Sequence, residues 1–173
     1  KEVACITTLK DFTPVQKKRL EWLTELSNKV DIDFFGRDNI KHKFFNFCGA
    51  PERPINNNIL SSKDKSILLE YNKTLSIENG SEINFITRVV EPLLCWAMPI
   101  YYGCPNIHNI YPDGSYRYVN ILEEISDSVI EEIKRPVTPQ EIRSIEEARS
   151  LILKKYNFWF VMEDIIRMDY KNV

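Results

Sequence analysis

The segment spanning residues 71–107 constrains the fold of this chain most, because short apolar runs alternate there with polar turns. Residues 74–77 have the length and β-branched content of a buried strand, which ends in a polar turn at Glu78. Between residues 85 and 97 apolar side chains recur at steps of three and four, which predicts a helix. Residues 98–102 form another strand-length apolar run. The segment therefore predicts a β-α-β unit.

A strongly capped helix and two further strands precede this unit. The sequence TPVQ at residues 13–16 supplies an N-cap hydroxyl, a proline at the first helical position and a glutamine that completes a capping box. The helix that begins there should run to about residue 28, between strands at 3–8 and 30–35. The alternation predicts an α/β fold, a Rossmann-like three-layer sandwich with a mainly parallel central sheet.

The remaining segments are predicted to complete a single domain over residues 1–173. Residues 38–62 show no clean periodicity and are expected to form a long loop, followed by a short helix that delivers the chain into the central unit. A short strand is expected at 116–121. Amphipathic helices follow at 123–135, 138–155 and 159–168, so the C-terminal helical region covers about 138–168.

Composition argues against several classes of function. The formal net charge is −2 and no basic run exceeds three residues, so neither nucleic acid nor an anionic membrane is an expected partner. The four cysteines form no C-x-x-C pair, so we expect free thiols in a reducing compartment and no metal site. No stretch is long enough to span a membrane, and no signal peptide or glycine-rich nucleotide motif occurs. A cytoplasmic location is expected, with peripheral membrane attachment of the full-length protein as the alternative.

Polar side chains cluster where the predicted strands end. In a doubly wound sheet, ligands bind outside the carboxyl ends of the strands, and anions bind at helix N-termini such as the one predicted near Thr87. A guanidinium at a strand end, as at Arg37, can donate hydrogen bonds to two phosphate oxygens at once. The alternative is that Arg37 is a solvated arginine in a loop. The candidate ligand-binding residues at this edge are Arg37, Glu78, Asn79, Phe85, Thr87, Arg88 and Asn106.

Three motifs in order resemble the donor-binding half of family 10 glycosyltransferases, the fucosyltransferase family. Residues 78–80 (ENG) resemble the family's phenylalanine-glutamate-asparagine-serine turn. Residues 85–87 (FIT) resemble its tyrosine-x-threonine-glutamate-lysine helix start, and 98–103 (MPIYYG) its proline-(isoleucine or valine)-tyrosine-tryptophan-glycine strand. Upstream, residues 19–37 resemble the family's helix leading into a strand that ends in glycine-arginine. The resemblance covers roughly residues 5–121, and three ordered motifs are more specific than any one alone.

The resemblance implies that the chain is the C-terminal half of a GT-B glycosyltransferase and binds a GDP-sugar, with GDP-fucose as the first candidate. It also implies inverting transfer to a glycan acceptor without a metal or other cofactor. The seven candidate residues would bind the donor, with Arg37 matching a family arginine and Phe85 standing in place of a tyrosine. In the family the general base comes from an N-terminal, acceptor-binding half, and no matching half precedes Lys1 here. The catalytic residue is therefore unknown, and the isolated chain is expected not to transfer sugar.

One departure from the family pattern leaves alternatives open. Arg88 and Val89 stand where the family has glutamate and lysine, so Arg88 either takes over phosphate binding or marks a different donor, or none. Pro92 inside the predicted helix would cost about 3 kcal/mol without a kink. A non-catalytic glycosyltransferase-like module that binds a partner protein or a glycan is the alternative function. A transferase that uses UDP-activated or other sugars is a weaker third possibility.

Overall fold

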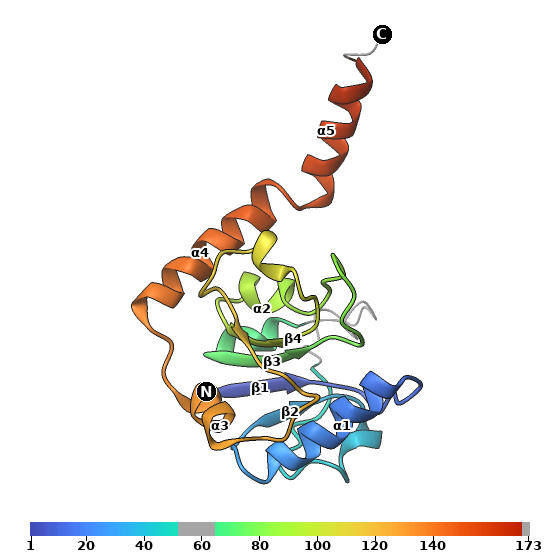
Figure 1. The fold of residues 1–173 in the computed structure, drawn as a ribbon, viewed down its shortest axis with the longest axis vertical. Coiled ribbons are helices and arrows are strands. Elements are labelled where there is room, and N and C mark those ends of the chain that lie inside the picture. Colours follow the sequence, from blue (N-terminus) through green and yellow to red (C-terminus); the bar gives the residue numbers. More distant parts are fainter. Residues whose placement is uncertain (52–64, 171–173) are drawn as a thin grey trace, which may run out of the picture.

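The computed structural model describes residues 1–51 and 65–170. Within these residues, five parallel strands form a sheet in the order β2-β1-β3-β4-β5 (Figure 1). This parallel sheet, with its helices, confirms the predicted α/β fold class. The strands are β1 (Val3–Ile6), β2 (Asp33–Phe35), β3 (Lys73–Ile77), β4 (Met98–Tyr102) and β5 (Arg117–Tyr118).

Five α-helices accompany the strands in the described part of the chain. Capping boxes are present at the start of α1, where the sequence predicts one, and at the start of α4. Thr13 and Thr138 each accept a hydrogen bond from the backbone N–H of the third helical residue. Short 3-10 helices occur at Asp38–Ile40, Ser66–Glu70 and Ile107–Asn109. The α-helices are α1 (Pro14–Ser27), α2 (Val90–Leu94), α3 (Asp127–Lys134), α4 (Pro139–Lys154) and α5 (Phe158–Tyr170).

Alternation along β1 divides the buried residues between the two faces of the sheet. Val3 and Cys5 belong to the main core, which also includes Leu23 and Leu26 of α1. Ala4 points to the opposite face and joins a smaller cluster with Leu68 from the 3-10 helix that precedes β3. Fully burying a leucine side chain is worth about 1.5–3 kcal/mol, so α1 is fixed to the sheet by its apolar stripe.

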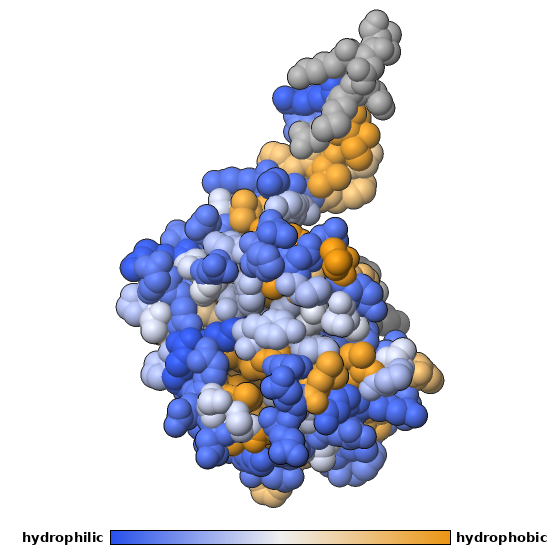
Figure 2. Space-filling view, in the orientation of Figure 1, coloured by the Kyte–Doolittle hydropathy of each residue, from blue (hydrophilic) through white to orange (hydrophobic). Residues whose placement is uncertain are grey.

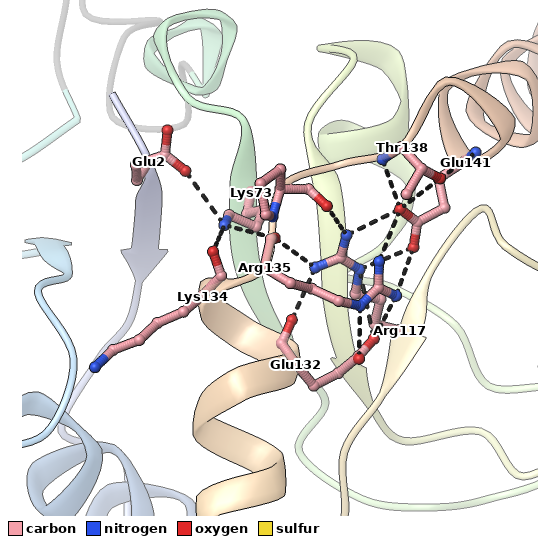
Figure 3. Close-up of polar contacts among 9 residues, drawn as sticks. Glu2, Lys73, Arg117, Glu132, Lys134, Arg135, Thr138 and Glu141 are labelled. Atoms are coloured by element: carbon pink, nitrogen blue, oxygen red, sulfur yellow. Dashed lines mark hydrogen bonds and ion pairs between the residues drawn. The ribbon is translucent and has the colours of Figure 1, made fainter.

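The edge of the sheet opposite the strand carboxyl ends is fixed by a buried lysine. Lys73, at the start of β3, is 1% exposed, and its Nζ donates hydrogen bonds of 3.1 Å to the carbonyls of Lys134 and Arg135. These carbonyls lie at the end of α3, where cations are favourable. Glu2 adds an ion pair at 3.2 Å (Figure 3). The lysine thus ties the end of α3 to the sheet.

Arg117 and Glu141 extend this polar cluster to β5 and α4, as Figure 3 shows. Arg117 donates bonds of 3.0 and 2.9 Å to the Glu141 carboxylate, and Arg135 contacts the same carboxylate. Burial alone would raise the pKa of Glu141, but hydrogen bonds from Arg117, Arg135 and the Thr138 N–H hold it far below its ordinary value. The cluster fixes the linker between α3 and α4 to the sheet.

The predicted helix over residues 85–97 is wrong in its first part. The observed helix α2 begins at Val90, and residues 87 and 88 belong to the loop before it, where their backbone N–H groups donate to the carboxylate of Glu78. Pro92 therefore lies in the first turn of a short helix, where its missing N–H has no intrahelical partner to lose. The expected cost of an interior proline does not arise.

Other boundaries differ by a few residues from the prediction. β1, β2 and β5 are shorter than expected, and α3 begins after the N-cap Ser126 rather than at residue 123. The predicted loop at 38–62 contains a 3-10 turn at Asp38–Ile40, and its part from residue 52 onward lies outside the described residues. Boundaries are set by individual caps and ladder bonds, which periodicity does not specify.

Helix α5 projects from the rest of the domain (Figure 1). Its large apolar residues are exposed, including Trp159 at 78% and Phe158 at 66%, and Figure 2 shows apolar surface on this segment. Across residues 1–51 and 65–170, no helix is both long and apolar enough to cross a membrane.

Candidate functional site

The topology places a crevice between the carboxyl ends of β1 and β3. β2 lies on one side of β1, whereas β3, β4 and β5 follow on its other side, so the winding of the sheet reverses at this point. In open α/β sheets ligands bind outside the strand ends at such a reversal. Thr7 and Thr8 follow β1 there, and Glu78 and Asn79 follow β3.

A buried arginine from α1 reaches this crevice. The Arg19 side chain is 1% exposed, and its Nη1 donates a 2.6 Å hydrogen bond to Oδ1 of Asn79. Its Nη2 donates to the backbone carbonyls of Thr8 at 3.2 Å and Lys10 at 3.4 Å. Its Nε is buried without a hydrogen-bond partner among the described residues. All of these acceptors are neutral, so no carboxylate in the described chain compensates the charge.

A second arginine lies close to the first. Arg88 is half-buried just before α2. The burial of Arg19 itself and, second, the positive charge of Arg88 lower the pKa of Arg19 to about 10. Arg19 nevertheless stays charged at neutral pH. Two like charges at a buried site repel each other and lose hydration, which is unfavourable unless an anion is present. The pair therefore has the electrostatics that favour binding of an anion.

Arg88 also borders a small polar hollow beneath α2. The hollow has a volume of about 40 Å³, and the buried hydroxyl residues Thr74 and Ser76 line it together with an ion pair between Lys65 and Glu91. This volume has room for a water molecule but not for a nucleotide. A nucleotide therefore does not fit inside this hollow.

Glu78 anchors the loop that carries Arg88. Its side chain is fully buried, and Oε1 accepts hydrogen bonds from the backbone N–H of Thr87 at 2.5 Å and of Arg88 at 2.8 Å. Oε2 accepts from the Thr87 hydroxyl. These bonds correct one expectation from the sequence. The N–H groups of Thr87 and Arg88 are not free to bind phosphate, because they donate to Glu78.

Asn106 fixes the same loop from the end of β4. Its Nδ2 donates to Oδ1 of Asn84 at 2.8 Å, and its Oδ1 accepts from the Asn84 N–H at 3.0 Å. Asn84 has a left-handed φ of 60°, a conformation that asparagine tolerates better than most residues. Gly103 leaves room for Glu78, because a Cβ there would collide with Glu78 Cγ and the Tyr101 hydroxyl. The β3–α2 loop is thus held at both ends.

Arg37 and Arg88 line different hollows at the strand ends. Arg37 follows β2, and it lines a hollow of about 500 Å³ at the carboxyl ends of β1 and β2. Arg88 lines the separate small hollow next to β3. The two arginines follow strands on opposite sides of β1, which sequence reasoning could not specify without the strand order. A role in donor binding stays a prediction for both.

The other candidate residues lie around the crevice with different degrees of access. Phe85 is 46% exposed on the β3–α2 loop, so its ring is available to a ligand. Asn79 is half-buried and engaged by Arg19, and Thr87 is exposed although its hydroxyl is bonded to Glu78. Within the described parts of the chain, no three histidine, cysteine or acidic side chains gather as a metal site requires.

Arg19 was missed in the sequence because this residue belongs to the basic triplet KKR at residues 17–19, and such a triplet is typical of the exposed face of a helix. One signal could have found it. Arg19 precedes Leu23 by four residues and Leu26 by seven, so it belongs to the apolar face of α1. A charged residue on a buried helix face requires a partner or a ligand.

Comparisons with known proteins identify the fold. No protein-family model and no curated protein matches the sequence. A crystal structure of an α1,3-fucosyltransferase with GDP-fucose superposes with a TM-score of 0.53 and 17% sequence identity, over 86% of this chain and 38% of that chain. The α1,3-fucosyltransferase structure with GDP gives a TM-score of 0.53 and 17% identity, over 86% of this chain and 37% of that one.

A GtfA/B complex superposes with a TM-score of 0.50 and 13% identity, over 87% of this chain and 33% of that chain. The chain therefore has the Rossmann-like α/β fold of GT-B glycosyltransferases. It spans well under half the length of each of these structures.

Proposed function

We propose that this chain is the donor-binding domain of an inverting glycosyltransferase whose donor is a GDP-sugar. GDP-fucose is the first candidate for that donor. The observation that carries the proposal is Arg19, a buried guanidinium without an acidic partner among the described residues, placed beside Arg88 in the crevice between β1 and β3. Support for the nucleotide comes from the two similar α1,3-fucosyltransferase structures, one with GDP-fucose and one with GDP.

Arg19 and Arg88 would hold the diphosphate of the donor. The charge on the leaving diphosphate increases as the bond to the sugar breaks, and fixed cations stabilise that charge without having to reorganise. Arg19 is fixed in this way, since Asn79 and the Thr8 carbonyl orient its guanidinium. Arg88 is only half-buried, and so it can adjust to the phosphate it contacts. In this assignment Arg88 performs the task of the family's lysine from a neighbouring position.

The remaining candidate residues divide into those that touch the donor and those that position others. Phe85 is exposed enough to pack on a ring of the donor. Glu78 and Asn106 act on the donor through the loop, because their polar atoms are bonded to Thr87, Arg88 and Asn84.

The general base of the inverting reaction is proposed to lie outside this chain, in an acceptor-binding half. A general base must reach the attacking hydroxyl on the face of the sugar opposite the leaving group. Glu78 is the acid nearest the crevice in the candidate motifs, but it is fully buried and both of its oxygens are engaged by the loop. Glu78 is therefore unsuited to take a proton from an acceptor.

A nucleotide panel tests the donor assignment. Calorimetric titration of the purified chain with GDP, UDP, ADP and CMP should show saturable binding of GDP at micromolar to low-millimolar concentration and weaker binding of the others. Tighter binding of UDP than of GDP would show that the donor is a UDP-sugar, and the chain would still be assigned to a transferase. Absence of all nucleotide binding, together with a stable complex with a protein or a glycan, would favour the non-catalytic module.

A further inference from the structure

A second hollow lies beside the crevice and has its own chemistry. It has a volume of about 500 Å³ and lies where β1 and β2 end. We propose that it binds an acidic sugar of the glycan acceptor, with Lys10 and Arg37 contacting the acid group. The identification of the ligand as an acceptor rests on the proposed transferase function. The hollow is lined by Ile6, Thr7, Thr8, Leu9, Lys10, Phe12, Gly36, Arg37, Asn39, Ala50 and Pro51.

The charges of this hollow favour an anion. Lys10 and Arg37 are both exposed, and neither side chain forms a hydrogen bond or ion pair with any residue in 1–51 or 65–170. Among the described lining residues of this hollow there is no aspartate or glutamate. Asp11, next to Lys10 in sequence, lines a different hollow along α1. An arginine and a lysine in one lining, with no competing acid among its described residues, can bind a carboxylate through two parallel hydrogen bonds and neutralise its charge.

The other walls have the mixed character that a sugar ring needs. Phe12 is 83% exposed at the rim, so its ring is available to stack on the apolar face of a sugar. Thr7, Thr8 and Asn39 supply hydroxyl and amide groups that can bond sugar hydroxyls. Ligand pockets commonly measure about 300–1,000 Å³, so the hollow is large enough for one or two sugar units.

The hollow is next to the proposed donor crevice. Thr8 lines the hollow, and its backbone carbonyl accepts a hydrogen bond from Arg19, which we assign to the diphosphate. A sugar bound over β1 and β2 would therefore lie one strand away from the donor. That separation is suited to an acceptor whose acid group is held by this domain while its attacking hydroxyl approaches the donor sugar.

A matched pair of probes tests the assignment. Methyl β-D-glucuronide and methyl β-D-glucoside differ chiefly in a carboxylate, and each is titrated into the chain saturated with GDP while amide signals are followed by NMR. The glucuronide should bind at least about tenfold more tightly, since hydrogen bonds to charged groups are the stronger ones. Its largest shifts should fall on the amides of Thr7, Thr8 and Gly36.

Variants separate this hollow from the donor crevice. Arg37→Gln and Lys10→Gln should each weaken glucuronide binding about tenfold and leave glucoside binding unchanged. Lys10→Gln should also leave GDP binding unchanged. Lys41→Gln removes an exposed cation outside the lining and should change nothing. Phe12→Ala should weaken both sugars.

Two results would overturn the inference while leaving the donor assignment in place. The first is a chain that binds GDP but has equal affinity for the glucuronide and the glucoside. The second is an Arg37→Gln variant that loses GDP binding but keeps glucuronide binding. Preferential glucuronide binding by a chain that does not bind GDP would instead support the hollow as an acidic-sugar site and overturn its role beside a donor.

Discussion

Nη1 of Arg19 lies 2.6 Å from Oδ1 of Asn79, and this hydrogen bond joins α1 to the second residue after β3 across the crevice. The acceptor is an amide, so the bond orients the guanidinium without neutralising it. A carboxylate at the same position would have the geometry for an ion pair but would compete with any anionic ligand. The amide at residue 79 thus leaves the charge of Arg19 available to an anionic ligand, whereas a carboxylate there would use that charge to stabilise the fold.

Asn79→Asp should separate these two properties. The carboxylate would pair with the buried guanidinium, so the free energy of unfolding should rise by about 1 kcal/mol. GDP affinity should fall at least about tenfold, because the positive charge is already compensated. Urea unfolding and calorimetry measure the two effects, with Asn109→Asp as an exposed control. A variant that is more stable and binds GDP as well as the parent would exclude Arg19 from the site.

Glu78→Gln tests the loop anchor. The amide keeps one acceptor oxygen but replaces the other with a donor that faces the N–H or hydroxyl of Thr87. Loss of charge-assisted bonds in a buried site should lower the free energy of unfolding by about 2 kcal/mol. Protection of the Thr87 and Arg88 amides from hydrogen exchange should fall as well. Unchanged protection would show that Glu78 does not hold the loop.

Glu141→Gln should destabilise the chain in a pH-dependent way. The carboxylate of Glu141 has a pKa far below that of the unfolded chain, so its contribution is fully present above about pH 4.3 and is lost as pH falls toward the folded pKa. At pH 7 the variant should lose about 3 kcal/mol, the lower end for breaking a buried ion pair.

The difference between Glu141→Gln and the parent should shrink in urea unfolding experiments carried out at progressively lower pH below about 4.3. Glu146→Gln, which alters an exposed residue of the same helix, is the control and should have little effect at any pH. A difference that stays constant from pH 7 to pH 3 would contradict the assignment of the low pKa to this residue.

The isolated chain should bind a donor nucleotide but release no GDP in response to an acceptor. Loss of a base typically costs a factor of about a hundred to ten thousand, and loss of the acceptor's positioning costs more. The assay incubates the chain with GDP-fucose and oligosaccharide acceptors and compares GDP release with and without them. Robust acceptor-dependent release would place the base within this chain.

The sequence predicted the fold well because the fold depends on repeated local signals. The capping boxes at Thr13 and Thr138 and the apolar strand runs each specify an element by themselves, and together they allow only a few topologies. The exact start of α2 depends instead on a contact between Glu78 and residues 87 and 88, which no periodicity encodes.

The site was harder to predict than the fold, because its geometry depends on strand order. Glu78, Asn79 and Arg88 lie between β3 and the helix that follows it, so their neighbourhood follows from one β-α connection. The separation of Arg37 from Arg88 required the order β2-β1-β3. Arg19 required knowledge of which face of α1 is buried against the sheet, and only the spacing of Leu23 and Leu26 hinted at it.

The most direct test of the account is GDP binding by Arg19 variants of the purified chain. Arg19→Gln should weaken GDP binding by about 1.5–3 kcal/mol, the usual worth of hydrogen bonds to a charged group, while Arg19→Lys should retain part of the affinity. Circular dichroism confirms that each variant is folded, and Lys41→Gln serves as the exposed control. GDP binding that is equal in the parent and in a folded Arg19→Gln variant would contradict the central claim that this buried guanidinium holds the diphosphate.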